Sequence, residues 1–131
     1  MSTSLKMLLS NITLPNMVYL KKKNMLVEAT EVDLYKLTLY KDYVFLPYVK
    51  DPEMYDLFLD HYHLVKEKRR LHQSDDFESE FCRFIHYNKK YDHSLWDKYF
   101  DFKTNYLKPI LIKWCKTNKI SYVDDIGSII I

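Results

Sequence analysis

The sequence predicts a mainly helical fold (α or α+β), with three to five helices and a small β-element near the N-terminus. After residue 50, apolar residues recur every three or four positions behind recognisable helix starts. Before it, short apolar segments alternate with turns and prolines. A length of 131 residues fits one domain with its own core. We therefore expect a single compact domain with a mixed part at 1–50, a helical bundle at 51–119 and a C-terminal tail at 120–131.

The mixed part contains one helix candidate and one hairpin candidate. Residues 4–11 predict a short helix, which Pro15 ends. The segments Met17–Leu20 and Met25–Val32 flank the polar run Lys21–Asn24, a pattern typical of a β-hairpin with a polar turn.

Two other stretches have two interpretations each. In residues 33–49, the run Tyr43–Leu46 fits a strand, the spacing of Tyr35 and Leu39 also fits a helix, and Pro47 ends either element. The tail at 120–131 fits a short strand or an apolar end packed against the bundle.

The helical part opens at Asp51. Asp51 is expected to cap free N–H groups, Pro52 suits the first helical position, and Glu53 favours the positive end of the helix dipole. Helical spacing continues through Val65, so we expect one helix that runs to about Leu71.

Two further helix starts follow. Asp75 and Glu78 have the spacing of a capping box within the start at Ser74–Asp76. The last start is Asp92–Ser94, and Pro109 predicts a kink or two consecutive helices near residue 108. The apolar faces are expected to share one core made of Phe58, Tyr62, Phe81, Phe84, Trp96, Phe100, Leu107 and Trp114.

Composition restricts the chemistry. The chain has one glycine, Gly127, and one alanine, Ala29, but 12 tyrosines. Because glycine and alanine need GC-rich codons, we expect an AT-rich source genome, such as that of a virus or a mobile element. Phosphate-binding loops and nucleophile elbows need several glycines at fixed positions, so this sequence excludes them.

Two explanations compete for the basic residues. The formal net charge is only +2, which gives little overall attraction to polyanions. The cations near predicted helix ends would complement helix dipoles, at about 0.3–1 kcal/mol each. Alternatively they form a nucleic-acid-binding face, and the candidates for it are Lys66, Lys68, Arg69, Arg70, Lys89 and Lys90.

The tyrosines outside the predicted apolar stripes are candidates for protein contact. Tyr55, Tyr87 and Tyr91 are the chosen candidates, and Tyr40 shares their pattern. Surface tyrosines give a large contact area at low entropy cost, which suits a protein interface.

Metal binding and catalysis have weaker support. Cys82 and His86 lie four residues apart on one predicted helix face and are weak zinc candidates. No paired zinc-ligand motif accompanies them, and the alternative places Cys82 in the core as a small apolar residue. Asp56 and Asp60 are interpreted as solvated surface residues. We expect no enzyme activity and no cofactor.

The leading hypothesis is a small non-catalytic binding protein that docks on a larger protein assembly, as an accessory subunit, adaptor or host-directed modulator. The alternatives are a nucleic-acid-binding protein and a zinc-stabilised helical domain. No apolar run reaches the length of about 18 residues that spans a membrane. Two cysteines do not form a disulfide framework. We therefore expect an intracellular protein without a membrane partner, whose oligomeric state the sequence does not define.

Overall fold

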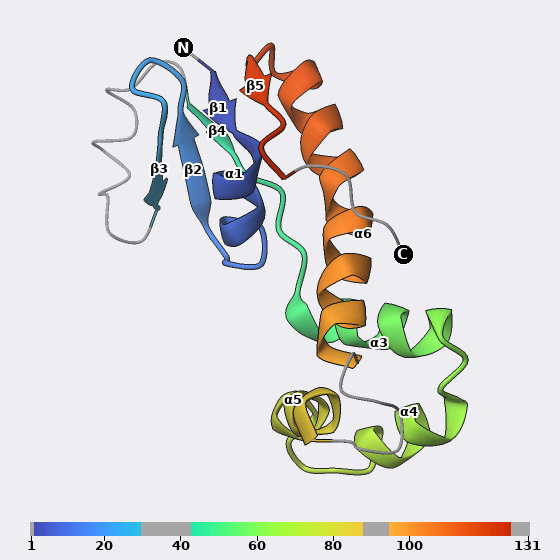
Figure 1. Ribbon diagram of the computed structural model, residues 1–131. Helices are drawn as coiled ribbons and strands as arrows, with labels where there is room; N and C mark the ends of the chain where they lie inside the picture. The colour runs from blue at the N-terminus through green and yellow to red at the C-terminus, as the bar shows by residue number, and fades with distance from the viewer. Residues whose placement is uncertain (1, 30–42, 88–94, 127–131) are drawn as a thin grey trace. The chain divides into compact units, whose positions relative to one another are not determined.

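The computed structural model describes residues 2–29, 43–87 and 95–126 (Figure 1). Its elements are β1 (Thr3–Ser4), α1 (Leu5–Asn11), β2 (Met17–Leu20), β3 (Met25–Glu28), β4 (Tyr43–Phe45), α3 (Asp51–His61), α4 (Val65–His72), α5 (Phe77–Tyr87), α6 (Leu95–Thr117) and β5 (Tyr122–Val123). More than half of the described residues are helical, so the predicted mainly helical fold with a small N-terminal β-element is confirmed.

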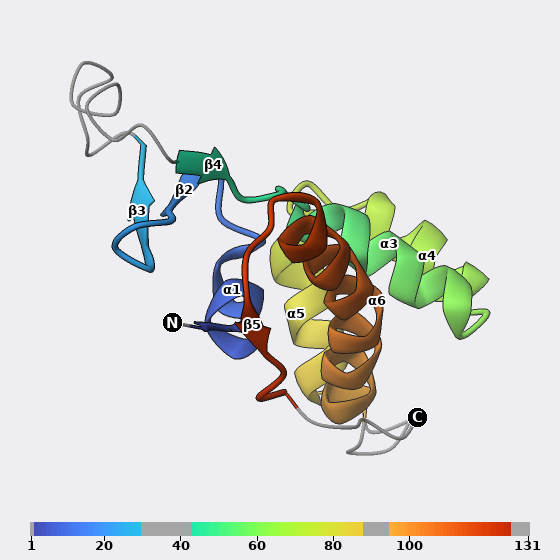
Figure 2. The same ribbon diagram turned by 90° about the horizontal axis from the view of Figure 1, so that it is seen from above.

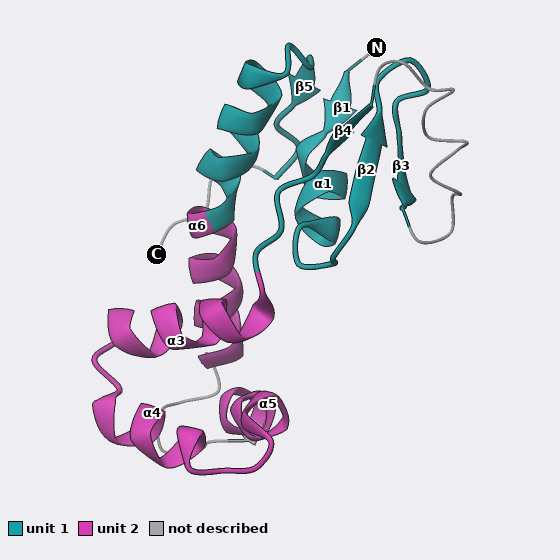
Figure 3. Ribbon diagram, turned by 180° about the vertical axis from the view of Figure 1, so that it is seen from behind, with its two compact units in different colours: residues 1–49, 107–128 teal, residues 50–106, 129–131 magenta. Residues whose placement is uncertain are grey.

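The chain divides into two compact units, coloured separately in Figure 3. Unit 1 combines residues 1–49 with residues 107–128, and unit 2 combines residues 50–106 with residues 129–131. Helix α6 therefore contributes its first half to unit 2 and its second half to unit 1.

A three-stranded antiparallel sheet, in the order β3-β2-β4, forms part of unit 1 (Figures 1 and 2). Strands β2 and β3 make the predicted hairpin, with Val18 opposite Val27. Strand β4 confirms the strand interpretation at its residues and pairs with the other side of β2, where Phe45 lies opposite Val18. Val18 and Leu20 are buried and pack against Val27.

Buried hydroxyls tie the N-terminus to this hairpin. The hydroxyls of Thr3 and Tyr19 contact one another, and each donates to Asn24 Oδ1, at 2.7 and 2.6 Å respectively. The Thr3 N–H donates to the Ser121 carbonyl at 2.8 Å, beside the parallel pairing of β1 with β5. The strand interpretation of the tail is thus correct at β5, whereas residues 127–131 lie outside the described part of the chain.

Helix α6 ends in a Schellman motif that uses lysine where glycine is usual. The Ile120 N–H donates to the Cys115 carbonyl at 2.8 Å, and the Lys119 N–H donates to the Lys116 carbonyl at 3.3 Å. Lys119 adopts the left-handed conformation that closes the motif, with φ of 56°. The helix is continuous through Pro109, so the expectation of two consecutive helices is wrong.

The single helix expected from Asp51 to Leu71 is also wrong, because the same motif interrupts it. The Leu64 N–H donates to the Leu59 carbonyl at 2.8 Å, and the His63 N–H donates to the Asp60 carbonyl at 3.1 Å. His63 has φ of 56°. Burial of both leucines seals the turn, and the chain re-enters a helix at α4.

Two predicted helix starts are displaced by one residue. The N-cap of α3 is Lys50, without a side-chain hydrogen bond, and Asp51 is already helical. At the start of α5, Asp76 rather than Asp75 receives the Ser79 N–H, at 3.1 Å. A capping side chain must precede the first helical residue, and the periodicity alone does not fix that residue.

Aromatic rings make the core of unit 2. Phe58 and Phe81 are fully buried, with ring centroids 6.0 Å apart, and Tyr99 packs against both at 5.3 and 5.2 Å. Phe84 is also buried, as predicted, whereas the predicted core residues Tyr62 and Trp96 are half-buried.

The core assignment of Phe100 is wrong, because 47% of this residue is exposed. Its neighbour Tyr99 points inward, and successive helical residues are about 100° apart around the axis. The remaining two predicted core residues belong to unit 1. Leu107 is fully buried, and half-buried Trp114 donates its Nε1–H to the Phe45 carbonyl at 3.0 Å.

Candidate functional site

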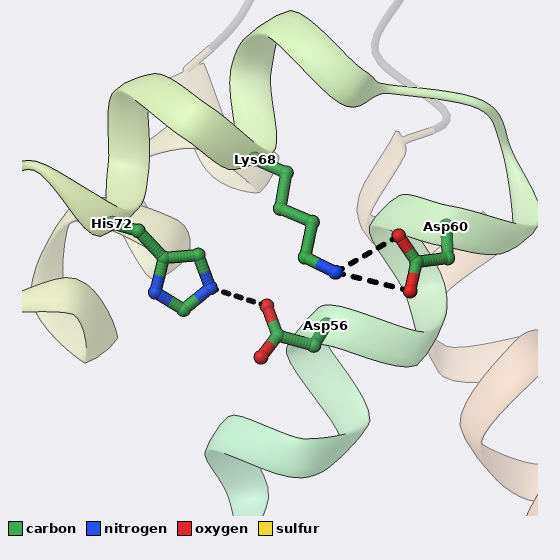
Figure 4. Close-up of polar contacts among 4 residues, drawn as sticks. All are labelled: Asp56, Asp60, Lys68 and His72. Atoms are coloured by element: carbon green, nitrogen blue, oxygen red, sulfur yellow. Dashed lines mark hydrogen bonds and ion pairs between the residues drawn. The ribbon is translucent and has the colours of Figure 1, made fainter.

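Helices α3 and α4 are joined by two parallel polar contacts (Figure 4). Lys68 Nζ donates to both carboxylate oxygens of Asp60, at 3.0 and 3.1 Å. One turn later in α4 and one turn earlier in α3, His72 Nε2 lies 2.5 Å from Asp56 Oδ1. The two aspartates are surface residues, as predicted, since Asp60 is exposed and Asp56 is half-buried, and each also pairs with a side chain of α4.

The outer side of α4 carries unpaired positive charge. Lys66, Arg69 and Arg70 are exposed, and none of them has an ion pair or a side-chain hydrogen bond with a described residue. At about 100° per residue, Lys66, Arg69 and Arg70 lie at least about 100° around the helix from buried Leu71, and exposed Val65 lies at the edge of this group, between His72 and Arg69. We call Val65, Lys66, Arg69 and Arg70 the basic face of α4.

The break between α3 and α4 changes the interaction of Lys66 with the helix dipole. At the end of one long helix, Lys66 would complement the negative end of the dipole. In the structure it is the second residue of α4, where the positive end of the dipole disfavours a cation. The dipole explanation therefore accounts for Arg69 and Arg70, which lie in the last turn, but not for Lys66.

The apolar member of the basic face was also misplaced by sequence reasoning. Val65 continues the apolar stripe of the expected long helix, yet 60% of it is exposed. The Schellman turn rotates the chain before Val65, so helical phase does not carry over from α3. The exposure of Val65 follows from its place on the outer part of α4, and that place can be assigned only once the break at His63 is known.

Three of the six nucleic-acid candidates thus share one surface. Lys66, Arg69 and Arg70 lie together on the basic face, whereas Lys68 points toward α3 and is neutralised by Asp60. The Asp60 carboxylate raises the pKa of Lys68 above its usual value, mainly through their hydrogen bond. Lys89 and Lys90 lie outside the described residues.

The tyrosine candidates give a different outcome. The interpretation of Tyr55 as a surface residue is wrong: its ring is buried and stacks on Phe81, with centroids 4.1 Å apart. Burial raises the pKa of its phenol well above the usual range. Tyr87 lies at the end of α5, but its side chain is outside the described set, as are Tyr40 and Tyr91 entirely.

Exposed aromatic rings that sequence reasoning missed lie instead on and after β4. Tyr43 and Phe45 point to the same side of the sheet, with ring centroids 6.2 Å apart, and Tyr48 follows them. All three are exposed, with Phe45 at 54%. The alternation of a strand was visible in the sequence, but the choice of the outward face was not.

The cysteine and histidine candidates do not gain further ligands. Cys82 is exposed, so its interpretation as a small core residue is wrong, and Cys115 is the buried cysteine. His86 stacks on Trp96, with centroids 4.2 Å apart. Within residues 2–29, 43–87 and 95–126, no three His, Cys, Asp or Glu side chains gather closely enough to hold a metal ion.

Tyr99 is the one buried phenol whose hydroxyl makes no hydrogen bond with the described residues. Burial is the main cause that raises its pKa far above the usual value of 10.0. At neutral pH this hydroxyl therefore stays protonated and adds packing rather than charge to the core.

Comparison with known proteins identifies no relative: no family model, no curated protein and no solved structure matches the chain. None of the described helices combines the length and the apolar character required to cross a bilayer. The exposed side chains of the described residues are therefore the evidence that bears on function.

Proposed function

We propose that this protein is a small non-catalytic binding protein that docks on an acidic surface of a partner protein through the basic face of α4. The observation that carries the proposal is the sorting of charge around one short helix. Lys68 and His72 face α3 and meet aspartates, whereas Lys66, Arg69 and Arg70 face outward without a described partner. Helix stability does not require this arrangement, because Lys66 sits at the unfavourable end of the dipole.

The composition of the face favours a protein partner over nucleic acid. Val65, at the edge of the three cations, is 60% exposed, so the face offers apolar as well as charged contact surface. The three cations span about 6 Å along the helix axis, at 1.5 Å per residue. A strongly salt-dependent duplex-binding protein can contact about 6–10 phosphates, whereas these three cations can meet about three.

The experiment compares defined probes of equal charge. Fluorescence anisotropy is recorded with a labelled helical peptide rich in glutamate and leucine, and with labelled single- and double-stranded oligonucleotides. The test variant is the triple Lys66→Ala, Arg69→Ala and Arg70→Ala. The matched control replaces Lys98, Lys113 and Lys116 by alanine, which removes the same charge from exposed positions of α6.

The proposal predicts that the acidic peptide binds and that the α4 triple variant weakens binding about tenfold, which corresponds to about 1.4 kcal/mol. The α6 control should bind as the wild type does. Equal losses in both triple variants would show general charge attraction and overturn the proposal. If oligonucleotides bind more tightly than the peptide, and the logarithm of their binding constant falls with the logarithm of salt concentration with a slope of about −2.7 for three phosphate contacts, the face binds nucleic acid instead.

A further inference from the structure

A hollow in unit 1 lies between the hairpin turn and the end of α6, far along the chain from the basic face of α4. Its lining residues are Tyr19, Lys21, Lys119, Ile120 and Ser121, and its volume is about 160 Å³. A buried water needs only about 10–15 Å³, so the hollow has room for a ligand of several heavy atoms.

Three of the side chains that line the hollow are donors without a partner in the described part of the chain. The ammonium groups of Lys21 and Lys119 and the hydroxyl of Ser121 have no hydrogen bond or ion pair with any described residue. None of the five lining residues is acidic. Two positive charges and a hydroxyl around one concave space are complementary to an anion that has several acceptor oxygens.

The backbone that carries these donors is well fixed. Lys119 occupies the left-handed position of the Schellman motif, and the Ser121 carbonyl receives the Thr3 N–H at 2.8 Å. Lys21 directly follows β2, whose Tyr19 hydroxyl donates to Asn24 in the same turn. The backbone of the donor residues therefore belongs to hydrogen-bonded elements, which limits the backbone entropy that would be lost on ligand binding.

The local field favours an anion despite the nearby helix end. The C-terminus of α6 contributes about −0.5 of an elementary charge, whereas Lys21 and Lys119 contribute two full positive charges. The Schellman hydrogen bonds also occupy the Cys115 and Lys116 carbonyls, which would otherwise repel an anion.

We propose that this hollow binds the phosphate group of a small phosphomonoester. A phosphomonoester carries a charge of about −1.5 to −2 at neutral pH and three acceptor oxygens, which matches two ammonium groups and one hydroxyl. A carboxylate would neutralise only one lysine. Tyr19 and Ile120 are nearly buried, so the lining that a ligand meets is mainly polar, and the phosphate group itself carries the recognition.

The test uses backbone amide NMR of the full chain, titrated with inorganic phosphate and with phenyl phosphate. The amide signals of Ile120 and Ser121 report on the hollow. Saturable shifts are expected with both probes, since both present the same phosphate oxygens to the two lysines and the serine. Absence of saturable shifts with both probes would overturn the proposal, and so would saturable shifts with inorganic phosphate alone, because the hollow would then not accept a phosphomonoester.

Three variants distinguish binding in the hollow from non-specific attraction of the anion to lysine side chains. Lys119→Gly removes one charge while glycine retains the left-handed backbone, and Lys21→Ala removes the other. Each should weaken phenyl phosphate binding about tenfold, as expected for the loss of one charge-assisted hydrogen bond. Lys116→Ala, an exposed position outside the lining, should leave affinity unchanged; an equal loss there would contradict the site.

Discussion

Lys68 donates hydrogen bonds to both carboxylate oxygens of Asp60, at 3.0 and 3.1 Å, and this contact defines which side of α4 faces α3. The remaining cations of α4 are thereby directed outward. The basic run of α4 thus has two parts: Lys68 pairs with α3, and the outward cations are available for binding. Single substitutions in the two parts should therefore have different effects, on stability in the first and on binding in the second.

The first prediction compares neighbouring lysines. Lys68→Ala should lower the thermal unfolding midpoint, because Asp60 loses its partner at the contact between α3 and α4, and it should leave affinity for the acidic peptide nearly unchanged. Lys66→Ala should do the opposite. Thermal unfolding followed by circular dichroism and peptide anisotropy check both effects, and a Lys66→Ala variant that is the less stable of the two would contradict the assignment.

The second prediction concerns the aromatic core. Phe81→Ala should lower the unfolding free energy by about 3–5 kcal/mol, because it leaves a cavity among Phe58, Tyr55 and Tyr99. Phe100→Ala should cost much less, since 47% of Phe100 is exposed. Urea denaturation of both variants measures the difference, and similar losses would mean that Phe100 belongs to the core after all.

The third prediction uses the left-handed turn between α3 and α4. The left-handed backbone conformation of His63 costs about 1–2 kcal/mol in a residue with a Cβ atom. Glycine avoids this cost, but its greater loss of chain entropy on folding costs about 0.5–1 kcal/mol relative to alanine. His63→Gly should therefore raise the unfolding free energy by up to about 1.5 kcal/mol. His61→Gly, at the last residue of α3, should instead lower it, because glycine disfavours helical geometry and the change also removes the ring contact of His61 with Phe102. Destabilisation by His63→Gly would argue against the observed backbone turn.

The fourth prediction concerns acid stability. The Ser4 hydroxyl and the Lys6 N–H donate to the Asp125 carboxylate and hold its pKa below the ordinary value of 3.8. A lowered folded-state pKa stabilises the protein above pH 3.8, and this stabilisation is lost as the pH falls through the lowered pKa.

Asp125→Asn should therefore lower the unfolding midpoint at neutral pH, and the difference from the wild type should shrink as the pH falls below 3.8. Thermal unfolding across a pH series measures it, with Asp97→Asn, an exposed position in α6, as the control. A difference that is constant with pH would show that the Asp125 charge is not the cause.

Much of the fold was predictable because it depends on local patterns. The hairpin of β2 and β3 follows from alternation around Lys21–Asn24, and α5 follows from apolar spacing behind an acidic start. The break at His63 was not predictable in the same way. A helix end is usually marked by glycine, and this chain, with a single glycine, uses His63 and Lys119 instead.

That one missed turn explains most errors at the candidate site. Without it, Val65 continues an apolar stripe and Lys66 lies near a helix end, so neither stands out. The burial of Tyr55 was missed for another reason, since its ring stacks on Phe81 of a different helix, and no pattern within α3 reveals that contact. The hollow beside Lys119 also depends on residues about one hundred positions apart.

The measurement that tests the central claim most directly is anisotropy of the labelled acidic peptide with the Lys66, Arg69 and Arg70 triple variant, beside the matched α6 triple variant. The account predicts that affinity falls about tenfold in the α4 variant and stays unchanged in the α6 variant. Unchanged affinity in the α4 variant, while it remains folded, would show that the outward cations of α4 are not a binding surface.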